Sequence, residues 1–577
     1  MHDTAFDVTQ QEYLKGFMAG VEARRGSLAP AGGGGGAPPD ALRAAQDAAI
    51  AAGGTLTPQE QAKREKHPLD RWDEIATRAE AGTFPKPIDD FLGRFHGLFF
   101  VGPAQDAFMC RLRIPGGILS SHQADGIAAI AEDCAGGYAD VTTRANLQLR
   151  EIPATKGAEV VMRLGDLGLL PRGTGADNVR NITASPTAGI DPAELIDTRP
   201  ILRALHHHIL HTRDLFALPR KFNISVSGGG AVEVLQETND ISLTAVETDL
   251  GLRFRLTLGG ISGHRDFARG TGAVVAPDEV VRVCDAILRV FIAEGDRTDR
   301  RKARLKYVLD RMGVEAFLGL VEARLGQPLE RMAEEAIRPG APPAKHGHVG
   351  VHAQRQPGLS YIGVVTPVGR LTAMQLRGLA EVARRFGSAT LRLTVWQNLL
   401  ISDIPEPHVP EALAAIAALG LTHEASALRG GLVACTGNAG CKFAASNTKR
   451  HAAQLADYLE TRISIDAPIN IHLTGCHHSC AQHYVADIGL LGAKVERGED
   501  LLEGYDLHVG GGAGPEQKIG RMIVKGVAAD ELGPAVLALL TAWMAQRRQG
   551  ESFQSFTARH DDAALAALAA AREEAFA

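Results

Sequence analysis

Four of the seven cysteines form two pairs that could hold one iron–sulfur cluster. Five residues separate Cys435 from Cys441 in ACTGNAGCKF, and three separate Cys476 from Cys480 in TGCHHSCAQHYVADIGL. A 4Fe-4S cubane needs four thiolates converging from short loops, and glycine beside a cysteine lets the backbone approach the inorganic sulfides. The grouping therefore predicts a protein that transfers electrons.

Two other interpretations of these cysteines stay open, a structural zinc site and unreactive core thiols. Zinc knuckles usually place about two to four residues between ligands, so the gap in the first pair fits zinc poorly. Buried free cysteine is common, but four in two close pairs is a dense grouping. The remaining cysteines, Cys110, Cys134 and Cys284, are expected to be core thiols.

Length and composition describe an ordinary globular protein. The chain has 577 residues, enough for several domains, with 45% hydrophobic and 22% charged residues. A net charge of −6 argues against nucleic acid as a partner. The N-terminus lacks a signal-peptide pattern, and no apolar run of about 18 residues occurs, so we expect no membrane contact and a cytoplasmic location.

A repeat with a constant offset of 252 residues relates the segments that begin at Pro115 and Pro367. Identical positions include Gln123/Gln375, Gly126/Gly378 and Asn146/Asn398. Each copy is predicted as a turn, a helix and a strand, for example a strand over Thr390–Ile401. The protein is therefore expected to be internally duplicated, an α+β body with a pseudo-twofold axis and a cofactor between the repeats.

We expect five segments along the chain, and the compact protein should begin near Leu56. The first contains a helical pattern over Tyr13–Arg25 and a flexible tether over Gly26–Pro39 with five consecutive glycines. The expected segments are 1–55 as N-terminal helix and tether, 56–170 and 341–425 as the two half-domains, 171–340 as the first larger α+β domain, and 426–577 as the domain that contains the paired cysteines.

Polar and cationic residues at several positions could face a large cofactor and an anionic substrate. The predicted strand Thr142, Arg144, Asn146 and Gln148 presents alternating polar side chains, which fits a cofactor-facing strand or equally a solvated face. Gln397 and Asn398 lie in the matching strand. Cations that could bind anions occur at Arg111, Arg180 and Lys221, and in a run predicted to span about three helical turns, Arg297, Arg300, Arg301, Lys302, Arg304 and Lys306.

TGCHHSCAQHYVADIGL resembles the sirohaem and 4Fe-4S signature of nitrite and sulfite reductases, in which an acidic residue follows the second cysteine by seven positions, here Asp487. ACTGNAGCKF, DVTTRANLQLRE, HPLDRWDEI, GRFHGLFF and GDRTDRRKARLKYVLDRMG are also similar to this family, over about residues 56–560. The resemblance implies an internally duplicated architecture with ferredoxin-like half-domains and two larger α+β sirohaem-binding domains.

The resemblance also implies roles for individual residues. The four paired cysteines, Cys435, Cys441, Cys476 and Cys480, would bind the 4Fe-4S cluster, and Cys480 would also bridge to the sirohaem iron. Arg111, Arg180, Lys221 and Asn223 would bind the substrate. The expected sirohaem contacts are Thr142, Arg144, Asn146, Gln148, Arg300, Lys302, Arg304, Lys306, Gln397 and Asn398.

Within the family, LPRKFN at Lys221 and Asn223 resembles the assimilatory, ferredoxin-dependent nitrite-reducing branch, whereas sulfite reductases show a second lysine there. This implies six-electron reduction of nitrite to ammonia in nitrate assimilation. No dinucleotide fingerprint is found, so reduced ferredoxin is the expected donor. We expect a monomer. The alternatives are a ferredoxin-dependent sulfite reductase, an oxygenase similar to precorrin-3B synthase, and a zinc-stabilised binding module.

Two short sequence features each allow two interpretations. His477 and His478 stand between the last two cysteines where the family often has Pro-Asn, and they could tune the cluster through hydrogen bonds or merely fill the loop. Lys63, Arg64 and Lys66 form a short positive run that could bind ferredoxin or be a solvated helix face.

Overall fold

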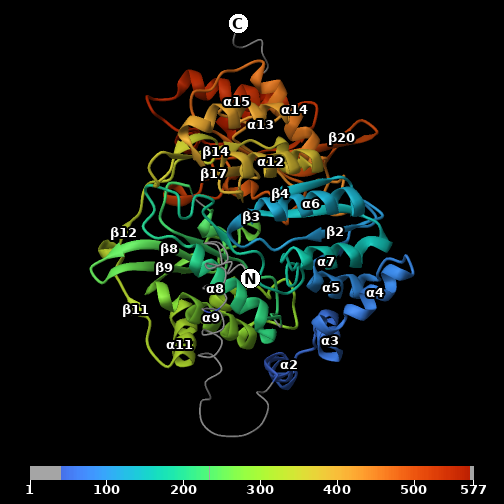
Figure 1. Cartoon of the computed structure of the whole chain (residues 1–577). Coiled ribbons are helices and arrows are strands. Elements are labelled where there is room, and N and C mark those ends of the chain that lie inside the picture. Colours follow the sequence, from blue (N-terminus) through green and yellow to red (C-terminus); the bar gives the residue numbers. More distant parts are fainter. Residues whose placement is uncertain (1–17, 19–39, 217, 233, 572–577) are drawn as a thin grey trace, which may run out of the picture.

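The computed structural model describes Met18 and residues 40–216, 218–232 and 234–571. The expected helix Tyr13–Arg25, Met18 excepted, and the tether Gly26–Pro39 lie outside these residues. In Figure 1 the C-terminal part of the chain, yellow to red, lies above the N-terminal part, and helices α6 and α12 lie one above the other where the two meet. Among the helices of the described residues, none combines the length and the apolar character needed to cross a membrane.

Two five-stranded antiparallel sheets exchange one strand each. Their orders are β1-β2-β5-β4-β15 and β13-β14-β17-β16-β3, so each sheet contains one short strand from the other repeat. Ile118 and Arg370, which begin β3 and β15, are 252 positions apart, as the sequence repeat requires. The strands are β1 (Leu98–Phe100), β2 (Phe108–Arg111), β3 (Ile118–Ser120), β4 (Tyr138–Thr142), β5 (Asn146–Ile152), β13 (Gly350–Ala353), β14 (Leu359–Val364), β15 (Arg370–Thr372), β16 (Thr390–Leu393) and β17 (Leu399–Pro405).

The repeat identities have physical reasons in the helices that follow the exchanged strands. α6 (Ser121–Cys134) and α12 (Ala373–Phe386) both begin with a capping box, in which Gln123 and Gln375 bond back to the N-cap backbone. A Cβ on Gly126 or Gly378 would lie 2.5 Å or 2.3 Å from a leucine side chain, so both positions need glycine. One hydrophobic core contains residues of both repeats. The expected duplication is confirmed.

The other two sheets repeat a second topology, three parallel strands continued by two antiparallel ones. The first sheet contains β6 (Thr183–Ala184), β7 (Ile224–Ser227), β8 (Ile241–Thr248), β9 (Gly251–Leu258), β10 (Arg269–Val275), β11 (Glu330–Arg331) and β12 (Arg338–Pro339), and the second contains β18 (Gly431–Ala434), β19 (Asn470–Thr474), β20 (Ile488–Arg497), β21 (Asp500–Val509) and β22 (Arg521–Ala528). The expected α+β class is therefore confirmed.

The remaining helices cover these sheets, and the N-terminal ones correct one boundary. α2 packs against α9 with Leu42 buried, so the folded chain begins before Leu56. The helices are α2 (Ala41–Ala51), α3 (Pro58–Glu65), α4 (Trp72–Glu80), α5 (Pro87–Gly93), α7 (Gly157–Asp166), α8 (Arg199–His211), α9 (Val280–Glu294), α10 (Leu305–Met312), α11 (Val314–Leu325), α13 (Val409–Ala418), α14 (Thr448–Glu460), α15 (Leu532–Gln546), α16 (Phe553–Ala558) and α17 (Asp562–Ala570).

Two expected strands are hairpins instead. Thr390–Ile401 contains all of β16, a turn, and the start of β17, with Gln397 in the left-handed region at φ 60°. The chain likewise turns between β4, which ends at Thr142, and β5, which begins at Asn146. The alternation of polar residues was therefore wrongly interpreted as one strand face.

Candidate active site

The paired cysteines follow two adjacent parallel strands. Cys435 comes directly after β18 and Cys476 two residues after β19, and these strands pair in parallel. Carboxyl ends of parallel strands meet at one edge of a sheet, so the two cysteine loops start side by side. The backbone N–H of Cys435 donates to the carbonyl of Leu473 at 3.0 Å, which joins the loops at their base.

The surroundings of Cys435 suit a charged sulfur. Its Sγ accepts hydrogen bonds from the backbone N–H groups of Gly437 at 3.4 Å and Gly475 at 3.2 Å. A Cβ on Gly475 would lie 2.5 Å from Ala444 Cβ, so only glycine lets the two loops approach this closely. Backbone donors aimed at sulfur are what a cluster-bound thiolate requires.

The four cysteines lie close enough to one another to interact electrostatically. All are free thiols, and three are half-buried. Burial, together with the negative charges of Cys480, Cys441 and Cys435, raises the pKa of Cys476 to about 12. Within the described residues no three His, Cys, Asp or Glu side chains are spaced to hold a single ion. The donor set therefore fits a wider iron–sulfur cluster better than a zinc ion.

Three predicted substrate cations come together beside Cys480. Arg111, the last residue of β2, and Arg180 both donate to the carbonyl of Thr174, Arg111 at 3.2 Å. Arg180 N–H donates to the carbonyl of Phe222 at 2.8 Å, and Phe222 is the neighbour of Lys221. In the described part of the chain, no carboxylate lies within 4.0 Å of any of the three cations.

The pKa shifts of Lys221 and Arg111 both include an interaction with Cys480, so these two cations lie near that cysteine. The positive charge of the group is not compensated by a carboxylate of the described residues. Burial and the nearby charge of Arg304 lower the pKa of Lys221 to about 7, and Cys480 opposes the shift. Burial likewise lowers the pKa of Arg111 to about 10, again opposed by Cys480. Arg180 Nε is buried and has no hydrogen-bond partner among the described atoms. This group of cations fits an anionic ligand.

Comparison with known proteins agrees with this site. Residues 175–329 and 427–561 match the family model of the nitrite and sulphite reductase 4Fe-4S domain, and residues 102–167 and 352–419 match that of the nitrite/sulfite reductase ferredoxin-like half domain. A ferredoxin–nitrite reductase of Synechococcus elongatus is 37% identical over 502 residues, 85% of this chain and 97% of the relative. The chain belongs to the nitrite and sulfite reductase family.

Other members of the nitrite and sulfite reductase family match over similar lengths. An assimilatory ferredoxin-dependent nitrite reductase of Haloferax mediterranei is 32% identical, covering 84% of this chain and 88% of that one. The solved structure of the NirA protein of Mycobacterium tuberculosis superposes with a TM-score of 0.83 at 30% identity, covering 90% of this chain and 99% of that chain. The resemblance and the duplicated fold predicted from the sequence are thus confirmed.

Several residues that the family resemblance assigned to sirohaem hold the protein itself together. Arg144 donates to the carbonyls of Asn181 and Ile224 and to Asn239 Oδ1, at 2.7, 3.3 and 3.0 Å, so it fixes the loop that carries Arg180. The other members with partners inside the protein are Thr142, bonded to Arg144 N, Asn146 to Leu112 O, Gln148 to Arg150, Gln397 to Val141 O and to Ala434 O and N, and Asn398 to Thr366 N.

The cationic run from Arg297 to Lys306 does not form the predicted helical turns. Residues 295–304 form a loop rather than helical turns, because α10 begins only at Leu305. Most of its cations are paired with aspartates, and Lys302 is exposed. The pairs are Arg300 with Asp177 at 2.7 Å, Arg304 with Asp240 at 2.7 Å, and Lys306 with Asp266 and Asp310 at 2.8 Å each.

A buried charge network supports the loop that carries Arg180, and it includes Lys63 from the expected ferredoxin patch. Lys63 is 2% exposed, so it cannot bind a partner protein; its Nζ contacts Glu60, Asp177 at 3.4 Å and the carbonyl of Leu218 at 3.0 Å. Asp177 stands three residues before Arg180. Sequence reasoning missed this role, because a lysine in a charged helix is usually exposed.

Asp177→Asn is expected to lower the free energy of unfolding by about 3–5 kcal/mol, because the buried ammonium of Lys63 and the guanidinium of Arg300 lose their counter-charge. Urea unfolding measures this. The control Asp47→Asn, which removes a partly exposed pair with Arg64 in the same N-terminal region, should change stability by less than about 1 kcal/mol. Equal effects of the two variants would contradict the network.

Contacts between distant segments hold the cysteine loops in place. Thr143 Oγ1 donates to the carbonyl of Cys480 at 2.9 Å, and Arg150 Nη1 donates to the carbonyl of Gly440 at 3.2 Å, next to Cys441. Both donors come from the β4–β5 hairpin of the first repeat. Both residues stand in DVTTRANLQLRE, but their partners lie 337 and 290 positions away, so the motif alone does not show these contacts.

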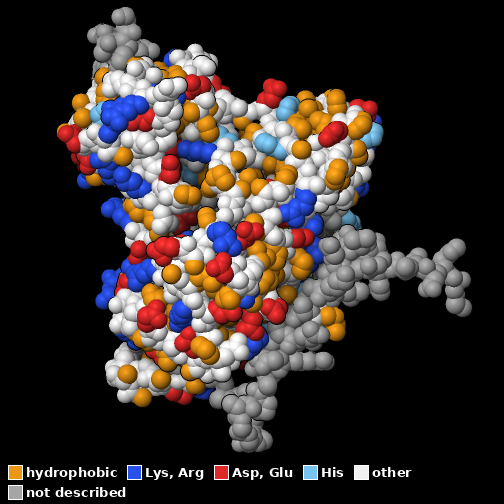
Figure 2. All heavy atoms as spheres, turned by 90° about the vertical axis from the view of Figure 1, so that its left-hand side faces the viewer, with side chains coloured by type: hydrophobic (Ala, Val, Ile, Leu, Met, Phe, Trp, Pro, Cys, Tyr) orange, Lys and Arg blue, Asp and Glu red, His pale blue; other side chains and the backbone are white. Residues whose placement is uncertain are grey.

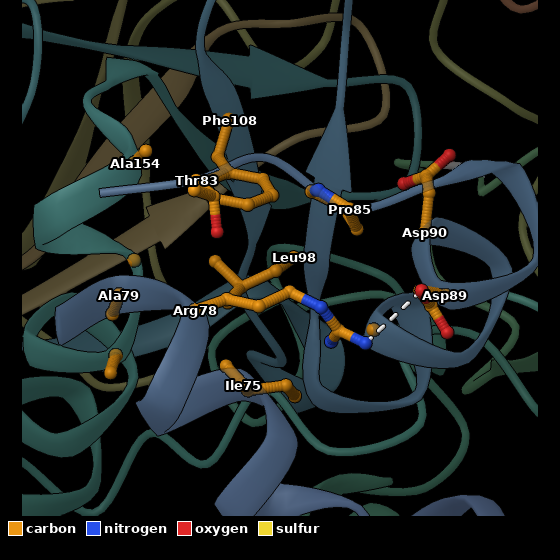
Figure 3. Close-up of a pocket in the computed structure, with 13 residues that line it drawn as sticks. Ile75, Arg78, Ala79, Thr83, Pro85, Asp89, Asp90, Leu98, Phe108 and Ala154 are labelled. Atoms are coloured by element: carbon orange, nitrogen blue, oxygen red, sulfur yellow. Dashed lines mark ion pairs between the residues drawn. The ribbon is translucent and has the colours of Figure 1, made fainter. Parts of the chain in front are cut away.

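A small apolar hollow lies apart from this site, between α4, α5 and α7 (Figure 3). Ile75, Leu98 and Phe108 line it, and Arg78 pairs with Asp89 beside it at 3.1 Å. Its lining contains no cysteine and no predicted site residue. The hollow therefore reflects the packing of the N-terminal helices on the first half-domain.

Proposed function

We propose that this protein reduces nitrite to ammonia in nitrate assimilation, with six electrons supplied one at a time by reduced ferredoxin. The observation that carries the proposal is the set of Arg111, Arg180 and Lys221 beside Cys480 without a carboxylate partner in the described chain. The ferredoxin–nitrite reductases named above support it, because they match along nearly their whole length. Monomeric state and cytoplasmic location stay predictions.

The residues that would hold the cofactors are the four cysteines for the 4Fe-4S cluster, with Cys480 shared between the cluster and the sirohaem. When bound, these groups supply one-electron redox chemistry at an iron open to substrate. Thr143 and Arg150 hold the cysteine loops from the first repeat.

The cations would both hold the anion and supply protons. Nitrite loses its two oxygens as water and leaves as ammonium, so the site must donate protons repeatedly. Arg111 and Arg180 are fixed by the shared carbonyl of Thr174 and can orient an anion. Lys221 has no hydrogen bond among the described residues, and a pKa of about 7 lets its ammonium give up and regain a proton near neutral pH.

Asn223 is proposed to favour nitrite over sulfite, because its amide adds no charge beside Lys221. Its backbone N–H donates to Asp240 at 2.8 Å, which fixes the position. Asn223→Lys should raise the ratio of kcat/KM for sulfite to that for nitrite by about tenfold, since a further cation suits the more highly charged anion. Asn223→Asp is the matched control and should lower the ratio. An unchanged ratio in the lysine variant rejects this role.

A steady-state assay of the purified holoenzyme with a reduced one-electron donor tests the proposed function. Nitrite and sulfite are offered in parallel, and ammonium and sulfide are measured. We expect ammonium formation with the larger kcat/KM for nitrite. A larger value for sulfite would assign the chain to sulfite reduction, and turnover of neither would reject the proposal.

A further inference from the structure

An exposed aromatic side chain contacts the cysteine site from outside. Phe443, two residues after Cys441, is 58% exposed. Its ring packs edge-on against that of His478, with centroids 5.1 Å apart, and His478 Nδ1 lies 3.4 Å from Cys476 Sγ. Continuous contacts therefore lead from the surface through His478 to a cysteine sulfur.

Positive charge flanks this pair. Lys442 Nζ lies 5.5 Å from the centre of the Phe443 ring. The segment with exposed Arg265 adjoins His478, because a Cβ on Gly263 would lie 3.2 Å from the His478 carbonyl oxygen. The Arg265 guanidinium is 5.0 Å from the Tyr484 ring centre. For neither Lys442 nor Arg265 does any described carboxylate lie within 4.0 Å.

The positive charge of this surface is opposite in sign to the net charge of the chain. The chain has a net charge of −6, and on the face shown in Figure 2 positive and negative side chains are interspersed. An uncompensated cationic patch around an exposed aromatic ring is the chemistry that binds an acidic protein surface with an apolar centre.

We propose that Lys442, Phe443, His478 and Arg265 form the docking surface for a small acidic one-electron carrier protein. The proposal rests on the function proposed above and names the place where its donor binds. At each encounter the reduced carrier would lose one electron, and the iron–sulfur cluster that the four cysteines would hold would accept it, with Phe443, His478 and Cys476 between the two centres. Of the run Lys63, Arg64 and Lys66 that the sequence offered instead, Lys63 is buried, and Arg64 and Lys66 are paired with Asp47 and Glu74.

Arg265→Glu in the holoenzyme tests the docking surface. The Kd for an oxidised acidic [2Fe–2S] ferredoxin should rise at least about fivefold at low salt, and the difference should shrink at about 0.5 M salt. Phe443→Ala should also raise the Kd about fivefold. With the reduced ferredoxin KM should rise in parallel, whereas activity with reduced methyl viologen should stay unchanged in Arg265→Glu.

Arg462→Glu is the matched control. Arg462 is also exposed, also lies over a tyrosine ring at 3.9 Å, and has no carboxylate within 4.0 Å in the described structure. It follows the far end of α14, about 20 Å along the helix from Thr448, which bonds to Cys435. Its Kd should stay within about twofold of the parent. Equal Kd values for the two glutamate variants would overturn the docking surface, whereas a parent enzyme inactive on nitrite with methyl viologen would reject the proposed function instead.

Discussion

Replacing Cys480 with alanine should lower kcat for nitrite by more than about 100-fold. Loss of groups that only support a metal ligand already costs about 10–100-fold, and Cys480 is proposed as a ligand shared by both cofactors. Its place beside Arg111 and Lys221 puts it where substrate would bind. Steady-state turnover, iron content and the visible absorption spectrum measure the effect.

Cys284→Ala is the control for this variant. Cys284 is fully buried in the core around α9, far from the cysteine loops in the fold, so its loss should cost about 1 kcal/mol of stability and leave the iron content unchanged. If Cys480→Ala kept the spectrum and the turnover of the parent, the shared-ligand role would be wrong.

Lys221→Met should lower kcat/KM for nitrite by about 100-fold, the usual cost of removing a group that stabilises developing charge. The loss should depend on pH. Because the pKa of Lys221 is lowered to about 7, its charge is present below that pH and is lost above it. In the parent enzyme, kcat/KM should therefore fall as pH rises through about 7, and this fall should be absent in the methionine variant.

Lys525→Met controls for the loss of one positive charge, since Lys525 is exposed on the edge strand β22. It should leave both the value and the pH dependence of kcat/KM unchanged. A methionine variant of Lys221 with the same pH profile as the parent would show that another group titrates.

The grouping of the four cysteines was predictable because they stand in two short segments of the sequence. Cys435, Cys441, Cys476 and Cys480 stand in short loops whose spacing already describes one cluster, and glycine next to them shows where the loops approach. The duplication was predictable for a similar reason. A capping glutamine and a close-packed glycine recur at Gln123/Gln375 and Gly126/Gly378 because each repeat needs the same local contacts.

The sirohaem contacts were less predictable because polar periodicity does not show where a chain turns. Asn146 and Asn398 recur as hairpin residues that bond to backbone, which alternation alone cannot distinguish from a cofactor-facing strand. The burial of Lys63 could not be predicted for another reason. Its partner Asp177 is 114 positions away, and only the folded chain brings the two together.

The number of electrons used per nitrite tests the central claim most directly. Limiting nitrite is given to the holoenzyme with excess reduced ferredoxin, and oxidised ferredoxin and ammonium are counted together. Cationic residues that retain and protonate an anion beside Cys480 predict six electrons and one ammonium for each nitrite consumed. One electron for each nitrite, with nitric oxide released and no ammonium, would contradict the account.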